Sequence, residues 1–101
     1  MSNRLDLHEM LCDILGSRSV YFQPPESVRL VYPAIIYKLS NIRNRHANNR
    51  VYIQGDSYEV TVITDDPDSD IVRKISMLPN CRYDRGFVSD NLYHTVFTLS
   101  F

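Results

Sequence analysis

The stretch Ser57–Asp65, with the sequence Ser-Tyr-Glu-Val-Thr-Val-Ile-Thr-Asp, decides the fold. Apolar, aromatic and β-branched residues alternate with polar ones along it, and this period of two is typical of a strand with one buried face. Ile63 is an apolar exception on the polar side. We expect a central strand over about 57–65, with one set of residues on its buried face: Tyr58, Val60, Val62 and Thr64.

The chain before this stretch contains two more strand patterns. Residues 33–42 alternate, with Ile35, Tyr37 and Leu39 on one face, and the apolar run around their start predicts burial on both sides there. A short strand is expected at about 19–23, because the two prolines that follow it cannot continue a hydrogen-bonded ladder. Residues 24–32 then form a loop, and Val51–Ile53 is a further short strand or a lead-in to the central strand.

Two segments have helical spacing. The first covers about 3–15, with Ser2 or Asn3 available as a cap and Gly16 available to end the helix in the left-handed conformation. The second covers about 69–78, where Asp68 or Ser69 can cap the start and Pro79 follows the end. The expected apolar positions of the two helices are Leu5, Leu7, Met10, Leu11, Ile14, Leu15, Ile71, Val72, Ile75 and Leu78.

The chain ends with two strand patterns, at about 81–88 and 92–101, joined by the turn Ser89-Asp90-Asn91. In the first of them, simple alternation puts Cys81, Tyr83 and Phe87 on one side. In the second, aromatic and aliphatic residues alternate with polar ones. We expect the aromatic residues of this hairpin to face the core: Tyr83, Tyr93, Phe97 and Phe101.

These elements predict an α+β protein: a single, mainly antiparallel β-sheet with two α-helices packed on one face. The 101 residues form one domain, 1–101, because this length leaves no room for a second core. A chain of this size buries roughly 60–70% of its unfolded surface, which is enough for a core without metal or disulfide support. The apolar content of 44% and the charged content of 23% are ordinary for a globular domain.

The sequence predicts a protein made and used in the cytoplasm. It shows no signal-peptide pattern at its start and no apolar run of the roughly 18 residues that cross a membrane, so no membrane partner is expected. Its two cysteines, Cys12 and Cys81, belong to no motif and are interpreted as reduced, buried thiols.

Charge is balanced in total, at −1, but uneven along the chain. A basic, asparagine-rich segment at 41–50 is either a finger that touches DNA or an acidic neighbour, or a solvated loop or hairpin tip. The acidic segment at 65–70 does not match an EF-hand, because Ile71 and Met77 stand where glycine and glutamate are needed. The charged candidates for an interface are Arg43, Arg45, His46 and Arg50 in the basic segment, and Asp65, Asp66 and Asp68 in the acidic one.

No catalytic pattern is present in the sequence, so we expect neither enzymatic activity nor a cofactor or metal. The histidines His8, His46 and His94 share no ligand spacing, and His8 is interpreted as a surface side chain. There is no Gly-x-Ser-x-Gly elbow and no glycine-rich phosphate loop. A cysteine enzyme would need Cys81 to be exposed and acidic, with His94 as its base. The core side expected for Cys81 argues against this pair.

A series of segments from residue 32 onward resembles known proteins. The segments are Tyr-Pro-Ala-Ile-Ile-Tyr at 32–37, Asp-Ser-Tyr-Glu-Val-Thr-Val-Ile at 56–63, Asp-Pro-Asp-Ser-Asp-Ile at 66–71, Leu-Pro-Asn-Cys-Arg-Tyr-Asp-Arg at 78–85 and Asp-Asn-Leu-Tyr-His-Thr-Val-Phe at 90–97. In this order they resemble small neck and tail proteins of tailed bacteriophages, in the tail-terminator (tail-completion) group, over about two-thirds of the chain.

The resemblance implies a virion structural protein. Such proteins look like one antiparallel sheet flanked by helices, assembled as a ring, commonly of six subunits, on the head-proximal end of the tail tube. The ring stops tube polymerisation and offers a docking surface to the head connector or adaptor proteins. DNA passes through the lumen without sequence-specific binding. The implied partners are other copies of the chain, the tail-tube protein and the head–tail connector, first in the host cytoplasm during assembly and then in the virion.

The acidic and basic segments suit head-to-tail contacts between such subunits, because heterologous interfaces join different patches. Two other functions stay open. One is a neighbouring neck component, such as a head-closure or adaptor protein. The other is a small nucleic-acid-binding module that uses a sheet face, as RRM-like domains do, and it requires aromatic and basic residues together on one exposed face.

Overall fold

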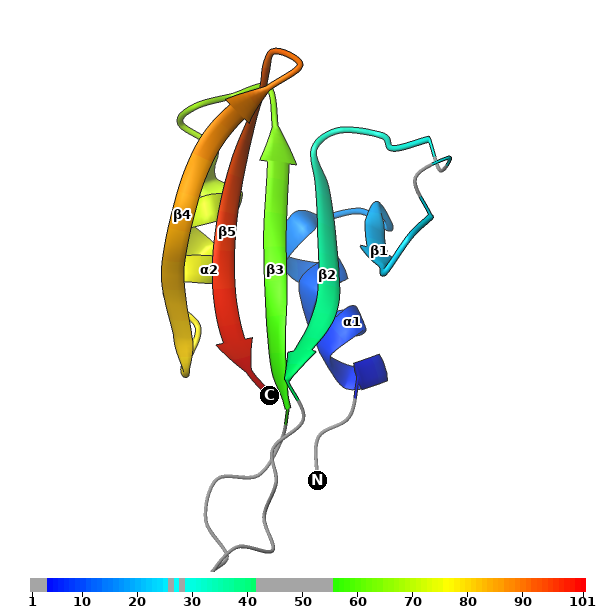
Figure 1. Ribbon diagram of the computed structural model, residues 1–101, viewed down its shortest axis with the longest axis vertical. Helices are drawn as coiled ribbons and strands as arrows, with labels where there is room; N and C mark the ends of the chain where they lie inside the picture. Colours follow the sequence, from blue (N-terminus) through cyan, green and yellow to red (C-terminus); the bar gives the residue numbers. More distant parts are fainter. Residues whose placement is uncertain (1–3, 26, 28, 42–55) are drawn as a thin grey trace, which may run out of the picture.

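The computed structural model describes residues 4–25, 27, 29–41 and 56–101. Two helices and a five-stranded, mostly antiparallel sheet make an α+β fold, which confirms the predicted class (Figure 1). Along the chain the elements are α1 (Arg4–Leu15), β1 (Val20–Phe22), β2 (Ala34–Asn41), β3 (Ser57–Thr64), α2 (Asp70–Ser76), β4 (Cys81–Ser89) and β5 (Leu92–Ser100).

The sheet has the strand order β1-β2-β3-β5-β4, so β3 lies in its middle and β1 and β4 lie at its edges. β3 pairs antiparallel with both β2 and β5, whereas β1 pairs parallel with β2. The registers align Tyr37, Val60 and Phe97 across the three central strands. All three side chains are at most 1% exposed, so the alternation that defines the central strand also defines the core.

One cluster of buried side chains contains residues of both helices and of the sheet. Leu7 and Leu11 of α1 are one helical turn apart and point to the same side, and Ile75 of α2 belongs to the same cluster. Figure 1 shows both helices behind the sheet. We call the sheet face that contributes to this cluster the inner face. Its strand residues are Val20, Ile35, Tyr37, Tyr58, Val60, Val62, Phe97 and Leu99.

Local hydrogen bonds define the end of α1 and the start of α2. Gly16 has φ 81° and donates its N–H to the Cys12 carbonyl at 2.8 Å, which closes α1. At the start of α2 the Ser69 hydroxyl accepts the Ile71 N–H at 3.2 Å, so Ser69, one of the two expected caps, is the N-cap. Met77 caps the other end, and α2 is therefore shorter than the expected 69–78.

The bounds of the other elements match the expected ones to within one residue at each end. The expected strand or lead-in at Val51–Ile53 and most of the basic segment lie outside the described residues.

The prediction that Phe87 shares a side with Cys81 and Tyr83 is wrong. A β-bulge lies between Tyr83 and Arg85, so Tyr83 is opposite Phe97 while Phe87 is opposite His94. The extra residue, Asp84, reverses the alternation for the rest of β4. Phe87 therefore lies on the sheet face opposite the inner face, which we call the outer face.

The prediction that the hairpin aromatics face the core is also wrong in part. Phe97 is buried, but Tyr83 is 61% exposed and Tyr93 is 38% exposed. Tyr83 lies on the inner face, yet β4 is an edge strand and few side chains reach it. Every residue of β4 after Cys81 is exposed.

Candidate functional site

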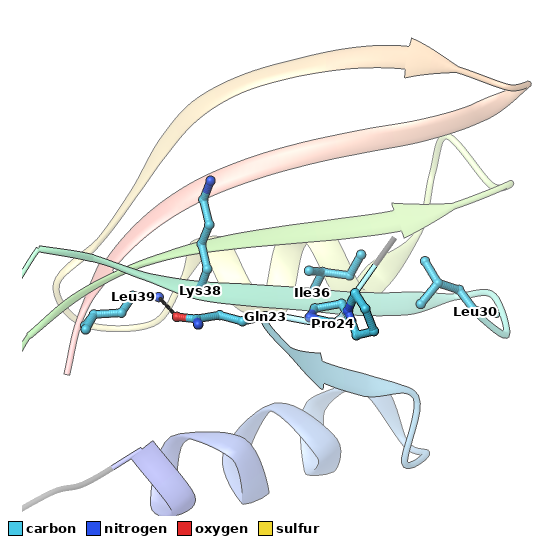
Figure 2. Close-up of a pocket in the computed structure, with 7 residues that line it drawn as sticks. Gln23, Pro24, Leu30, Ile36, Lys38 and Leu39 are labelled. Atoms are coloured by element: carbon cyan, nitrogen blue, oxygen red, sulfur yellow. Dashed lines mark hydrogen bonds between the residues drawn. The ribbon is translucent and has the colours of Figure 1, made fainter. Parts of the chain in front are cut away.

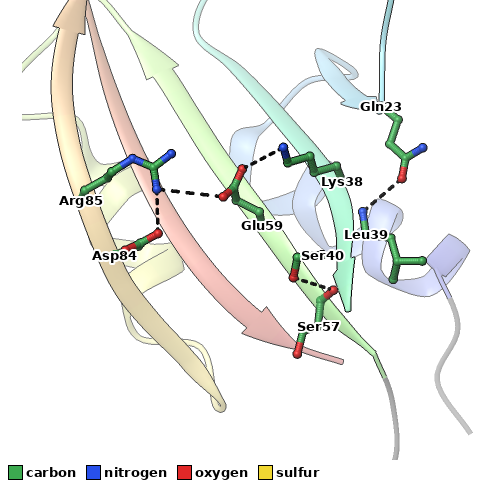
Figure 3. Close-up of polar contacts among 8 residues, drawn as sticks. All are labelled: Gln23, Lys38, Leu39, Ser40, Ser57, Glu59, Asp84 and Arg85. Carbon is green, nitrogen blue, oxygen red and sulfur yellow. Dashed lines mark hydrogen bonds and ion pairs between the residues drawn. The ribbon is translucent and has the colours of Figure 1, made fainter. Parts of the chain in front are cut away.

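A row of charged side chains crosses the outer face (Figure 3). Lys38 of β2 and Glu59 of β3 are directly opposite in register, and their charged atoms are 3.5 Å apart. Arg85 of β4 reaches over β5 to the other oxygen of Glu59 at 4.0 Å and contacts Asp84 at 2.7 Å. Two cations and two carboxylates alternate in this row, so it links three strands without a net charge.

An aromatic pair lies further along the same face. The Phe87 and His94 rings stack with centroids 4.7 Å apart and planes 12° from parallel. The His94 Nδ1 atom is 3.1 Å from the Leu92 carbonyl, which can only accept, so Nδ1–H donates and Nε2 carries no proton in the neutral ring. Among the described residues, the outer face thus carries the exposed aromatic side chain Phe87 and the cations Lys38, Arg85 and Arg82, the last of which is opposite Thr98.

A groove lies along β2 on the side of β1. Its volume is about 640 Å³, and Figure 2 shows Gln23, Pro24 and Leu30 alongside Ile36. The Gln23 side chain holds this arrangement, because its Oε1 accepts the Leu39 N–H at 3.1 Å. We call this feature the groove and define it by its lining residues: Gln23, Pro24, Pro25, Leu30, Ile36, Lys38 and Leu39.

The acidic candidates Asp65, Asp66 and Asp68 lie in the connection from β3 to α2, and all three are exposed. The Asp66 carboxylate accepts the Asp68 N–H at 2.9 Å, which shapes the turn before α2. In the described ranges none of these three carboxylates forms an ion pair. Their charge is therefore available to a partner.

The basic candidates Arg43, Arg45, His46 and Arg50 lie outside the described residues. The described residues on either side of the basic segment, however, show to which end of the sheet it is attached. Asn41 and Ser57 pair at one end, whereas Asp65 follows Thr64 at the opposite end. The two charged segments are thus attached to opposite ends of β3.

A polar contact that the sequence did not indicate joins α1 to β2. The Tyr37 hydroxyl is 2.8 Å from His8 Nδ1 and accepts a hydrogen bond from the Arg4 guanidinium at 3.2 Å. Arg4 also lies over the Phe22 ring, 4.4 Å from its centroid. The interpretation of His8 as a surface side chain is wrong, because its ring is half-buried against Tyr37.

Burial and nearby charge lower the pKa of His8. Desolvation is the largest cause, followed by the cations Arg18 and Arg4, while Glu9 raises it. Tyr37 is fully buried, and this burial raises the pKa of its hydroxyl. The contacts among Arg4, His8 and Tyr37 therefore favour a neutral His8 ring and a neutral Tyr37 hydroxyl beside the Arg4 cation. Their role is to pack α1 against β2.

The two cysteines do not form a nucleophile site. Cys12 is buried and Cys81 is half-buried, and burial raises the pKa of both thiols, which disfavours the reactive thiolate. Cys81 is opposite Leu99, whereas His94 is opposite Phe87 near the other end of β4. The thiol and the imidazole therefore cannot act together as nucleophile and base.

The exposed large apolar side chains of the described residues come from different parts of the fold. On α1 and just before β2 these are Leu5, Val31 and Tyr32. On the β4–β5 hairpin they are Tyr83, Phe87, Val88 and Tyr93, and Met77 is a separate one at the end of α2. Exposed apolar surface of this kind marks contact surfaces more often than it marks catalytic sites.

Comparisons with protein-family models, with curated proteins and with solved structures found no match to this chain. Among the residues that the structure describes, no group of three His, Cys, Asp or Glu side chains is placed to hold a metal ion. Neither described helix is long and apolar enough to span a membrane.

Proposed function

We propose that this chain is a structural subunit of the phage head–tail interface, a tail terminator that caps the tail tube as a ring. Two independent features support the proposal. The segments from residue 32 onward resemble that group of proteins. Exposed apolar side chains occur both on the β4–β5 hairpin at one edge of the sheet and on α1 and the segment before β2, and this observation carries the proposal because a subunit in a ring needs two different contact surfaces.

The charge distribution supports the same assembly. The acidic turn at Asp65, Asp66 and Asp68 carries carboxylates without ion-pair partners in the described ranges, and the basic segment is attached to the opposite end of β3. Opposite charges at opposite ends orient a head-to-tail contact and disfavour the head-to-head one. Like charge would repel two copies that met acidic end to acidic end.

In this function the chain binds copies of itself, the tail-tube protein below and the connector or adaptor proteins above. It acts in the host cytoplasm during assembly and in the virion neck afterwards. DNA passes through the lumen without being read, and no reaction is catalysed. A head-closure or adaptor protein of the same neck is the nearest alternative, since it shares these partners.

One observation favours a second candidate, a nucleic-acid-binding module. Phe87 lies on the outer face together with Lys38 and Arg85, and such a face can stack bases and attract phosphates. Against it, Lys38 and Arg85 already pair with Glu59, and Phe87 already stacks on His94. These three side chains would have to leave their partners to bind a strand, and Arg82 is then the one described cation of the outer face without an ion pair.

The deciding experiment measures the mass of the purified protein by light scattering, alone and mixed with the tail-tube protein of the same phage. The terminator function predicts a ring-sized species in at least one sample, at about six times the 11.8 kDa chain mass for six subunits. A monomer in both samples contradicts it and favours the adaptor or the nucleic-acid module. The fluorescence anisotropy of a labelled single-stranded oligonucleotide then separates those two functions. Only the nucleic-acid module is expected to bind the oligonucleotide, and Phe87→Ala should weaken that binding.

A further inference from the structure

The groove is built as a receptor for apolar side chains. Its walls are Pro24, Pro25, Leu30 and Ile36, and its charged member is Lys38, whose side chain is 59% exposed. None of the seven lining residues is acidic. The Lys38 ammonium is 3.5 Å from Glu59, so a carboxylate of an occupant would share this ammonium with Glu59. An occupant that fits this groove therefore presents apolar side chains with a single negative charge beside them.

The turn between β4 and β5 has this chemistry. We call residues 88–93 the hairpin tip. Val88 and Tyr93 are opposite each other in register, at 63% and 38% exposure, so their side chains stand together on one face. Asp90 lies between them in the chain, and the tip contains no cation. Apolar surface and one carboxylate therefore project together.

The hairpin tip is also a preorganised element. Asp90 and Asn91 are the two residues of the turn, and both have positive φ, at 54° and 63°. This geometry matches the right-handed twist of the flanking strands and favours a tight, well-defined turn. A rigid projection loses little conformational entropy on binding, so its exposed side chains contribute more fully to affinity.

Within one subunit the tip cannot reach the groove. β3 and β5 lie between β2 and β4, and three strand spacings amount to about 14 Å across the sheet. Only another molecule can bring a hairpin tip to this groove. A contact between two different patches of the same chain is heterologous and leads to a ring or an open filament.

We propose that the groove receives the hairpin tip of a second copy of this chain, with Val88 and Tyr93 against the prolines and Leu30, and Asp90 near Lys38. The inference rests on the proposed self-assembly and names its contact surfaces. Thr64, which precedes Asp65, is opposite Tyr93, so the hairpin tip and the acidic connection lie at the same end of the sheet. The groove of the next subunit would therefore receive the acidic end of this one.

The first test compares dissociation constants for self-association, measured by sedimentation. Val88→Ser removes an exposed side chain that folding does not need, and we expect association about tenfold weaker. Met77→Ser is the matched control, because Met77 is also exposed but lies at the end of α2. Lys38→Gln is expected to weaken association by about two- to fivefold, as for an exposed ion pair.

The second test mixes a Val88→Cys protein with a Pro25→Cys protein, both carrying Cys81→Ala so that the buried Cys12 is the only native thiol left. A mixed disulfide is expected, since it needs the two Cα atoms within about 7 Å. A Met77→Cys protein mixed with the Pro25→Cys protein is the control and should stay uncoupled.

The outcomes separate this inference from the proposed function. If a ring forms but Val88→Ser matches Met77→Ser and the mixed disulfide stays at the control level, the inference is wrong and the ring stands. If the disulfide forms while light scattering shows only dimers or filaments, the inference stands and the terminator function is wrong. A chain that stays monomeric and uncoupled at every concentration overturns both.

Discussion

At the residue scale, the hydroxyl of the buried Tyr37 has two polar side chains within hydrogen-bond distance, those of Arg4 and His8. It accepts from Arg4 and faces His8 Nδ1, and the arrangement that satisfies all three groups has the hydroxyl donating to an unprotonated Nδ1. A protonated His8 would place a third cation beside Arg4 and Arg18 in a half-buried position. The fold therefore favours neutral His8.

This preference predicts a pH dependence of stability. The folded protein holds the pKa of His8 below its ordinary value of 6.5, so the unfolded chain binds more protons as the pH falls past that value. The contribution of His8 to stability is complete above about pH 6.5 and is lost as the pH falls from there towards the folded pKa. The melting temperature should therefore drop over this window.

The comparison with His8→Asn isolates the effect, because asparagine keeps an acceptor near the Nδ1 position but does not titrate. We expect the melting-temperature difference between wild type and variant to change across the window, and an NMR titration to give a His8 pKa below 6.5. A His8 pKa at or above 6.5 would show that the Arg4–Tyr37–His8 contact is misassigned.

Val60 provides a second prediction at this scale. Its side chain is fully buried between Tyr37 and Phe97 in register, so Val60→Asp places an unpaired carboxylate in the core. We expect a loss of about 4 kcal/mol or more, a large part of the 5–15 kcal/mol typical of a domain. Chemical denaturation should find the variant unfolded or nearly so, whereas Ser57→Asp, at the half-buried start of β3, should melt cooperatively. A stable, cooperative Val60→Asp protein would contradict the position of the central strand.

At the element scale, the charged row on the outer face ties the edge strand to the middle of the sheet. Glu59 is the shared partner of Lys38 and Arg85, so Glu59→Gln removes both attractions at once. We expect a loss of about 0.5–1 kcal/mol in the free energy of unfolding, as for partly exposed pairs. Hydrogen exchange should rise in β4 more than in β2, because Arg85 reaches across β5.

Glu9→Gln is the control for this prediction, since Glu9 and Arg18 form an exposed pair on the other side of the molecule. Its effect on unfolding should be smaller and should leave β4 exchange unchanged. Equal exchange in β4 for wild type and Glu59→Gln would show that the row does not hold the edge strand.

The same scale shows how far the sequence could predict this structure. The positions of all seven elements follow from alternation, helical spacing and caps, because these are local signals. Local signals do not predict on which sheet face each β4 side chain lies. One extra residue, Asp84, reverses the alternation, and only the pairing with β5 reveals it. The groove and the His8–Tyr37 contact join residues far apart in sequence, and no local pattern encodes them. The prolines at 24 and 25 were visible as a strand end but not as a groove wall.

At the scale of the whole molecule, the acidic connection that follows β3 and the basic segment that precedes it are attached to opposite ends of this strand. The terminator function predicts that reversing Arg43, Arg45 and Arg50 to glutamate weakens assembly, because the acidic end of the next subunit then meets like charge. We expect association weaker by about tenfold or more, with the melting temperature unchanged. Light scattering and thermal denaturation of the same sample check both parts.

The matched control reverses Arg73 and Lys74, which are exposed in the last turn of α2. This variant should assemble like wild type. Assembly that is insensitive to the triple reversal would remove the basic segment from the interface, while leaving the groove and the hairpin tip as the contact to examine.

The bulge in β4 has a consequence for how such a protein survives at high concentration. A long, flat edge strand would recruit the edges of other chains and seed cross-β aggregates. Here Asp84 kinks the strand, and Arg82, Asp84 and Arg85 put charge along its exposed edge. Copies of the chain at high concentration are thereby protected from edge-to-edge pairing and fibrillation.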